Sequence, residues 1–196
     1  MIATLPVIVD ALIVDDLPAT RIWLARAVAI AFPDARVREA ADLMGGQRLC
    51  SERAPDLALI DLRLPDGHGA RLIEALHRLR PEACIVIPTI FDDDAYLFEA
   101  LRAGASGYLL KDQPPEKMAC HLQRLSAGES PLSVPLARRL LRMALNDALS
   151  LQEAERGLLQ ARARGLSVGE AARSLGLDGD RAGRLISAIY RRLSCA

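Results

Sequence analysis

Five polar side chains in separate parts of the sequence have the chemistry needed to accept and stabilise a phosphoryl group. Each lies at or just after the end of a short apolar segment, and the set is Asp15, Asp16, Asp61, Thr89 and Lys111. Carboxylates suit Mg²⁺, which proteins hold through a few carboxylates together with waters and phosphate oxygens. An aspartate can also act as a nucleophile and become an aspartyl phosphate, while cations neutralise the transferred oxygens. These residue types predict Mg²⁺-dependent phosphoryl transfer, provided that the fold brings them together.

The segments that carry these residues predict a parallel sheet. Apolar, β-branched runs alternate with helically spaced segments through the first 126 residues. The predicted strands are 11–14, 36–39, 57–60, 84–87 and 107–110, and the predicted helices are 21–32, 42–51, 70–79, 95–103 and 116–126. Because parallel neighbours need crossover connections, this alternation indicates a five-stranded, doubly wound α/β domain. Such sheets bind ligands at the carboxyl ends of their strands, so we expect the five residues to form one site.

The chain changes character after this domain. Lys plus Arg and Asp plus Glu both total 25, but residues 1–126 hold 14 basic and 18 acidic side chains (net −4) and residues 127–196 hold 11 and 7 (net +4). Prolines and serines at 129–135 indicate a linker, followed by a short amphipathic helix. We therefore expect a phosphoacceptor domain at 1–126, a linker with a connecting helix at 127–149, and a small all-α domain at 150–196.

Three helical segments make up the predicted C-terminal domain, at 151–164, 168–175 and 179–193. Two of them have a capping-box sequence at their start, Ser150-x-x-Glu153 and Ser167-x-x-Glu170, in which both side chains satisfy free backbone amides. The third helix is expected to begin at Asp178. The helix lengths and the tight turn before this last helix suit a helix-turn-helix.

The last of these helices is the predicted DNA-reading element. In a helix-turn-helix the second helix of the pair enters the major groove, and arginine can bind phosphates or read guanine. The apolar stripe of the helix leaves several side chains facing outward. Those that we expect to contact DNA are Arg181, Arg184, Ser187 and Arg191.

The composition excludes several classes of protein. With 51% apolar and 26% charged residues, the chain has enough apolar material for a core and is not disordered as its main state. Its four cysteines are far apart and lack metal-ligand spacing, which is typical of reduced cytosolic thiols. The apolar segment at residues 2–14 contains Asp10 and is shorter than the roughly 20 residues that span a bilayer. We therefore expect a cytoplasmic protein without membrane contact.

Four stretches of the sequence resemble the receiver domain and linker of NarL/FixJ-type two-component response regulators. They are LIVDD at 12–16, LALIDLRLPDGHG at 57–69, IVIPTIFDDDAYLFEALRAGASGYLLKD at 85–112 and GESPLSVPLARRLL at 128–141. The resemblance implies a flavodoxin-like receiver, phosphorylated by a histidine kinase, in a transcription regulator that is not an enzyme. Ile90 departs from the family, which usually has a small residue after the threonine, and its bulk is expected to restrict the pocket.

Carried over residue by residue, the resemblance implies a role for each polar side chain. Asp61 would accept the phosphoryl group. The Mg²⁺ ligands would be Asp15, Asp16, Asp61 and the backbone carbonyl of Arg63. Lys111 would pair with the phosphate, while Thr89 and Tyr108 would form the switch that reports it. The added charge and acceptor oxygens of a phosphoryl group are sufficient to draw the threonine hydroxyl inward.

The C-terminal segments ARGLSVGEAARSLGL at 163–177 and ISAIYRRL at 186–193 resemble the LuxR-type DNA-binding domain. The scaffold positions match the family better than the DNA-facing ones. The departures are Val168 and Gly169 for asparagine and lysine, residues 152–154 for threonine, proline and arginine, and residues 181–183 for threonine, valine and lysine. DNA binding is still favoured over its loss, because residues 151–196 hold eight arginines against five acids (net +3). A helix-turn-helix reads two half-sites, which predicts a homodimer.

Two alternatives to a DNA-binding regulator stay open at the level of sequence. In one, the C-terminal domain has lost DNA binding and makes a phosphorylation-dependent contact with another protein. In the other, the acidic residues belong to a Mg²⁺-dependent phosphohydrolase. The run Asp92, Asp93 and Asp94 is not assigned to a metal, because acidic residues are common at helix N-termini.

Overall fold

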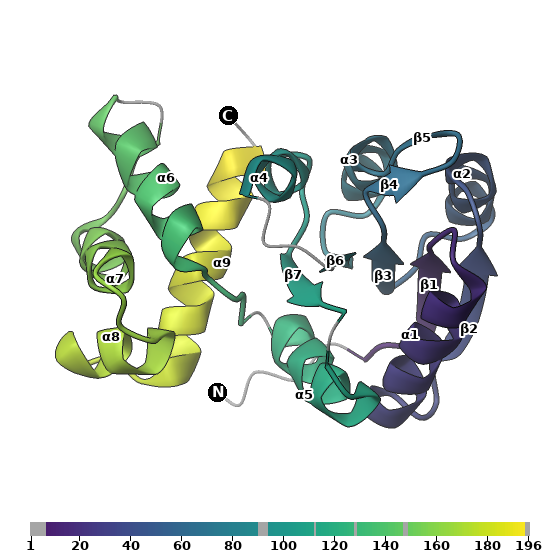
Figure 1. Cartoon of the computed structure of the whole chain (residues 1–196), viewed down its shortest axis with the longest axis horizontal. Coiled ribbons are helices and arrows are strands. Elements are labelled where there is room, and N and C mark those ends of the chain that lie inside the picture. The colour runs from purple at the N-terminus through teal and green to yellow at the C-terminus, as the bar shows by residue number, and fades with distance from the viewer. Residues whose placement is uncertain (1–6, 90–93, 112, 128, 147–148, 195–196) are drawn as a thin grey trace.

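The computed structural model, which describes residues 7–89, 94–111, 113–127, 129–146 and 149–194, has a parallel five-stranded sheet at its centre (Figure 1). The strands are β1 (Asp10–Val14), β2 (Arg36–Ala40), β3 (Leu57–Ile60), β6 (Cys84–Thr89) and β7 (Gly107–Leu110). Their order in the sheet is β2-β1-β3-β6-β7. All neighbouring pairs are parallel, so the carboxyl ends lie together. The predicted doubly wound fold is confirmed.

Five helices cover the two faces of this sheet. They are α1 (Pro18–Ala31), α2 (Leu43–Glu52), α3 (Ala70–Leu79), α4 (Asp94–Arg102) and α5 (Pro115–Ser126). Helices α1 and α5 share one apolar core, which includes Leu24 and Leu122, while α2, α3 and α4 share the other, which includes Leu72. Leu12 of β1 belongs to one core and Ile13 to the other. Strands buried on both faces have continuous apolar sequences, which made these segments recognisable.

A short hairpin between β3 and α3 was not predicted. Its strands are β4 (Arg63–Leu64) and β5 (Gly67–His68), which pair in antiparallel fashion. Strands of two residues are too short to give a hydrophobic period, so the sequence pattern carries no sign of them. The hairpin turns the chain back immediately after Asp61.

The first helix begins earlier than its apolar spacing predicts. It begins at Pro18 rather than at residue 21. Proline suits the first turn of a helix because the N–H that it lacks has no partner there, and its fixed φ already matches the helix. The amphipathic pattern marks only the part of the helix that packs on the sheet.

The predicted capping box at Ser150 is wrong. Helix α7 (Glu153–Ala163) begins after Gln152, whose backbone N–H donates to Oε2 of Glu155 at 2.8 Å. The same carboxylate accepts from Nη2 of Arg192 at 2.6 Å, and Glu155 is only 1% exposed. This start places a buried acid against its partners, which a start at Ser150 would not do. The box predicted at Ser167 is confirmed.

The remaining helices form the C-terminal part of the molecule. They are α6 (Val134–Leu145), α8 (Val168–Ser174) and α9 (Gly179–Ser194). The Asp178 carboxylate accepts from the Arg181 N–H at 2.6 Å, which confirms the predicted start of the last helix. Helix α9 packs on α7 and α8 and also on α4 of the sheet domain (Figure 1). Among the described residues, no helix has both the length and the apolar character needed to cross a membrane.

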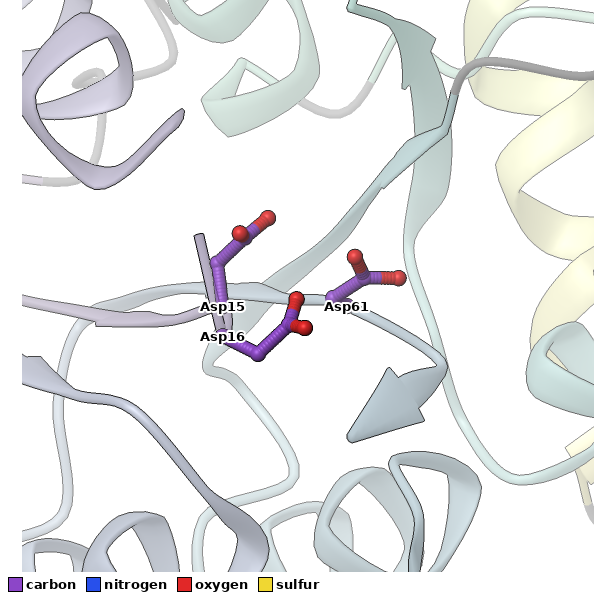
Figure 2. Close-up of side chains that lie close together, drawn as sticks. All are labelled: Asp15, Asp16 and Asp61. Atoms are coloured by element: carbon purple, nitrogen blue, oxygen red, sulfur yellow. The ribbon is translucent and has the colours of Figure 1, made fainter. Parts of the chain in front are cut away.

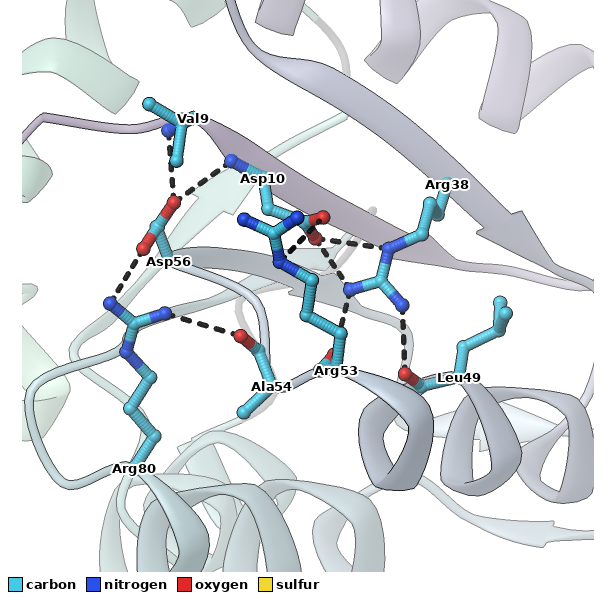
Figure 3. Close-up of polar contacts among 8 residues, drawn as sticks. All are labelled: Val9, Asp10, Arg38, Leu49, Arg53, Ala54, Asp56 and Arg80. Carbon is cyan, nitrogen blue, oxygen red and sulfur yellow. Dashed lines mark hydrogen bonds and ion pairs between the residues drawn. The ribbon is translucent and has the colours of Figure 1, made fainter.

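An ionic network holds the amino end of the sheet together (Figure 3). The carboxylate of Asp56 accepts from the backbone N–H groups of Val9 and Asp10 at 2.9 and 2.8 Å and forms an ion pair with Arg80 at 2.6 Å. Asp10 is itself buried and is paired with Arg38. Burial acts to raise the pKa of Asp56, but the two N–H groups and Arg80 outweigh it, so this pKa lies below its ordinary value.

We expect Asp56→Asn to lower the free energy of unfolding at pH 7 by about 1–3 kcal/mol, because a buried, hydrogen-bonded charge is lost. A carboxyl whose pKa is lowered by folding stabilises the native state above its unfolded pKa of about 3.9. This contribution is lost as the pH falls through the lower folded-state value. Wild type should therefore lose stability more steeply than the variant between about pH 5 and pH 2.

Urea unfolding followed by the fluorescence of Trp23, the only tryptophan, measures both effects. Glu52→Gln is the control, because Glu52 belongs to an exposed ion pair with Arg48 that should contribute less than about 1 kcal/mol. Equal pH dependence in wild type and the Asp56 variant would contradict the assigned role of Asp56.

Candidate functional site

Three carboxylates meet at the carboxyl end of the sheet, and we call them the acidic cluster: Asp15, Asp16 and Asp61 (Figure 2). Because β1 and β3 are adjacent, the residues that follow these strands are neighbours in space. Each carboxylate offers one oxygen, and the three oxygens lie within 4.8 Å of one another. Asp15 is buried, Asp61 is half-buried and Asp16 is exposed, so the cluster is accessible from solvent. Oxygen donors at this spacing fit a hard divalent cation.

Lys111, which follows β7, joins two members of this cluster. Its Nζ donates to Oδ2 of Asp15 at 2.6 Å and to Oδ2 of Asp61 at 2.7 Å. Burial acts to lower the pKa of Lys111, but the two carboxylates raise it by more, so the side chain stays cationic. Burial raises the pKa of Asp15, and the contacts with Lys111 offset only part of that increase. The structure thus brings together four of the five polar residues singled out in the sequence.

The loop that carries Asp61 depends on a glycine. A Cβ atom on Gly69 would lie 2.0 Å from the carbonyl oxygen of Asp61, closer than any contact between non-bonded atoms. The Gly69 N–H donates to the carbonyl of Leu62 at 2.9 Å, which closes the hairpin at the start of α3. Glycine is needed here for space, because only a residue without Cβ permits this approach of two backbone segments.

The hairpin is also fixed to the neighbouring helix. Both carboxylate oxygens of Asp66 accept from the first turn of α2, from the N–H groups of Leu43 at 2.7 Å and Met44 at 2.9 Å. These backbone donors hold the pKa of Asp66 below its ordinary value. Arg63, in β4, donates its backbone N–H to Oδ1 of Asp61 at 3.3 Å. The role of the Arg63 carbonyl as a Mg²⁺ ligand stays a prediction.

The two predicted switch residues lie on adjacent strands beside the cluster. Thr89 ends β6 and is half-buried, and its carbonyl accepts from the Lys111 N–H at 2.7 Å. Tyr108 is buried in β7, opposite Ile87. Their roles stay predictions. Three further residues named in the sequence analysis, Ile90, Asp92 and Asp93, lie outside the described residues.

The four predicted DNA-contacting residues of α9 do not share one environment. Arg181 and Arg184 are exposed, as expected. Ser187 was expected to face outward, but it is half-buried and its hydroxyl lies 2.8 Å from that of Ser130 in the linker. Arg191 is exposed yet lines a cavity of about 270 Å³ between α9 and the sheet domain. Packing of α9 against the linker and the sheet domain explains the correction for Ser187.

The contact between α9 and the linker is a close fit, which we call the docking seam and define as residues 183–190 against residues 129–131. A Cβ on the buried Gly183 would lie 2.9 Å from Cα of Glu129, so a larger residue does not fit. The Tyr190 hydroxyl donates to the carbonyl of Pro131. Burial, and the neighbouring Tyr108 of β7, raise the pKa of Tyr190. The predicted switch residue is therefore close to the C-terminal helix.

Two residues that hold this site in place were not found by sequence reasoning. Asp66 fixes the hairpin to α2, and Arg21 of α1 contacts the backbone carbonyls of Asp15 and Asp16. Asp66 lies in a turn-forming Pro-Asp-Gly sequence, which indicates a turn but not a partner in another helix. The sequence gives no signal that separates Arg21 from the other arginines.

Comparison with known proteins defines the class of this protein. Residues 11–123 match the family model of the response regulator receiver domain, which is more than half of the 196 residues. The chain belongs to the response regulator family, and the resemblance to NarL/FixJ-type regulators predicted from the sequence is confirmed.

Within this family, the chain is similar to the nitrate/nitrite response regulator protein NarL of Escherichia coli K12. The two are 32% identical over 162 residues, which is 79% of this chain and 75% of NarL. The oxygen regulatory protein NreC of Staphylococcus epidermidis is 32% identical over 113 residues, which is 57% of this chain and 52% of NreC. The chain thus spans about half the length of the NreC relatives that it matches.

Solved structures agree with this assignment. The signal receiver domain of a NarL response regulator from Mycobacterium tuberculosis has a TM-score of 0.56 and 28% identity, and it covers 63% of this chain and 99% of its own. A LuxR-family two-component response regulator from Aurantimonas has a TM-score of 0.57 and 29% identity, with coverage of 69% and 97%.

We expect Gly69→Ala to lower the free energy of unfolding by about 1–3 kcal/mol, because the added methyl group must displace the backbone at Asp61. Gly179→Ala is the matched control, since a Cβ there meets nothing within 4 Å. Urea unfolding curves of the two variants and wild type measure the difference. A Gly69 variant as stable as the Gly179 variant would contradict the close approach of the loop.

Proposed function

We propose that this chain is a two-component response regulator whose Asp61 accepts a phosphoryl group from a histidine kinase, with Mg²⁺ as the metal. The observation that carries the proposal is the contact of Lys111 with Asp15 and Asp61, because it joins groups from three strand ends at one point. The names of the NarL and NreC relatives favour regulation over a phosphohydrolase. The kinase is a partner of the protein, and catalysis of turnover is not part of its role.

The acidic cluster suits this chemistry. A carboxylate oxygen of Asp61 would form the bond to phosphorus as the phosphorus–nitrogen bond of a phosphohistidine breaks. The Mg²⁺ ligands would be Asp15, Asp16, Asp61 and the carbonyl of Arg63, and the ion supplies charge neutralisation for the phosphoryl oxygens. The Lys111 ammonium, already 2.7 Å from Oδ2 of Asp61, is positioned to contact a phosphoryl oxygen.

The proposed output is DNA binding by the C-terminal part of the chain. We assign residues 1–126 to the receiver, 127–149 to the linker and connecting helix, and 150–196 to a LuxR-type helix-turn-helix domain. In the arrangement that the structure has, which we call the closed arrangement, the docking seam covers one side of α9, while Arg181 and Arg184 stay exposed. Phosphorylation, reported by Thr89 and Tyr108, would favour release of this helix and pairing of two chains on DNA. A ligand or modification shifts such an equilibrium only by stabilising one arrangement more than the other.

Labelling with a small phosphodonor tests the phosphoacceptor. Acetyl phosphate with Mg²⁺ is expected to give at most one phosphate per chain, and Asp61→Asn or removal of Mg²⁺ by EDTA should abolish the label. Asp34→Asn, at an exposed loop position, should label like wild type. Intact-protein mass spectrometry measures the stoichiometry. Release of many phosphates per chain would overturn the proposal and favour a phosphohydrolase.

A second test addresses the docking seam and DNA. Gly183→Leu adds an uncharged side chain that cannot fit against Glu129, so it should open the closed arrangement and raise DNA affinity without phosphorylation, because more of the protein is then competent to bind. Gly179→Leu adds the same side chain to α9 at a position where a Cβ meets nothing within 4 Å, and it serves as the matched control. Gel shifts with a random duplex pool at low salt compare the two.

Equal affinities of the two leucine variants would contradict a seam that limits binding. If neither the phosphorylated nor the unphosphorylated wild type binds DNA, and Gly183→Leu does not either, the DNA-binding output is excluded. The phosphorylation-dependent contact with another protein would then account for the C-terminal domain.

A further inference from the structure

Arg21, in the first turn of α1, contacts the backbone of both adjacent aspartates. Its Nη1 donates to the carbonyl oxygen of Asp15 at 2.8 Å and to that of Asp16 at 3.3 Å. Its Nε donates to Oε2 of Glu39 at 3.2 Å, at the end of β2. The Arg21 side chain is only 17% exposed. One guanidinium group therefore links the loop that carries two members of the acidic cluster to a neighbouring strand.

The position of Asp16 depends on this link more than that of Asp15 does. The carboxylate of Asp15 is buried and is held by the Leu17 N–H at 2.9 Å and by Lys111. The carboxylate of Asp16 is exposed and, within the part of the chain that the structure describes, has no hydrogen-bond partner. Its place beside the other two carboxylates is therefore set by its backbone, whose carbonyl group Arg21 holds.

The geometry requires an arginine at this position. Two nitrogen atoms on different sides of the planar guanidinium contact different partners, the loop carbonyls and the Glu39 carboxylate. A lysine ammonium is a single donor atom on a flexible chain and cannot maintain both contacts at these distances. Glu39, in turn, keeps the guanidinium from rotating away from the loop.

We propose that Arg21 is a positioning residue for cation binding by the acidic cluster. The proposal rests on the Mg²⁺ site of the proposed function. Groups that orient metal ligands without touching the metal typically change metal affinity by roughly 10–100-fold when they are removed. Arg21 fits this role through the backbone of Asp15 and Asp16.

Electrostatics alone predicts the opposite result, which makes the proposal testable. Arg21 is a cation close to the cluster, so removal of its charge would attract Mg²⁺ more strongly if only charge mattered. A positioning role predicts weaker binding instead. Arg21→Lys distinguishes the effect of charge from the effect of positioning, because the lysine retains the positive charge but loses the contacts on both sides of the guanidinium.

Calorimetric titration of the unphosphorylated full chain with MgCl₂ measures the affinity directly, and Trp23 fluorescence gives a second signal. We expect Arg21→Gln and Arg21→Lys to bind Mg²⁺ about 10–100-fold more weakly than wild type. Arg26→Gln is the matched control, since Arg26 lies on the same helix, is 69% exposed and forms an ion pair at 3.7 Å with the exposed Glu116, away from the acidic cluster. It should bind Mg²⁺ like wild type.

Labelling rates with acetyl phosphate distinguish positioning from general damage to the fold. The rate of Arg21→Lys should recover to the wild-type value at saturating Mg²⁺ and fall below it at limiting Mg²⁺. Affinity in the Arg21 variants equal to or greater than that of wild type would overturn the positioning role. If wild type itself does not bind Mg²⁺, the cation site of the proposed function fails, which is a different result.

Discussion

The contact of one ammonium group with two carboxylates is the interaction on which the organisation of the acidic cluster depends. Asp15, Asp61 and Lys111 follow three different strands, and none of these groups is fully solvated. Like charges at this distance repel strongly in a partly buried site, so Lys111 is what makes the arrangement tolerable. The three carboxylates of the acidic cluster and one ammonium leave two formal negative charges, which matches the charge of a divalent cation.

The two ends of the sheet differ in how far their carboxylates are neutralised by cationic side chains. At the amino end, Asp10 and Asp56 each have arginine partners, and the network adds cohesion between strands and helices. At the carboxyl end, the negative charge exceeds the positive charge and part of it faces solvent.

Much of this architecture could be predicted from the sequence, because four of the five predicted strands are buried on both faces and therefore show as continuous apolar runs, whereas β2, at the edge of the sheet, is partly exposed. The convergence of Asp15, Asp61 and Lys111 followed from their places at the carboxyl ends of predicted parallel strands. The sequence could not predict contacts that depend on three-dimensional approach. The fit of Gly69 against the Asp61 carbonyl and the contact of Arg21 with two backbone carbonyls leave no periodic pattern. The outward position expected for Ser187 was wrong. The apolar stripe marks the side of α9 that packs on the neighbouring C-terminal helices, but α9 also packs against the linker and the sheet domain.

The place of β7 in the sheet gives the closed arrangement a further consequence. β7 is an edge strand: among the strands that the structure describes, it pairs with β6 on one side and with none on the other. Ser130 donates to the Ser106 carbonyl at the entrance to this strand, and Pro131 lies against Gly107. The linker therefore shields a part of the sheet that would otherwise present unpaired backbone groups to other chains. Movement of the linker away from β7 would therefore expose backbone groups to which a strand of another chain can add.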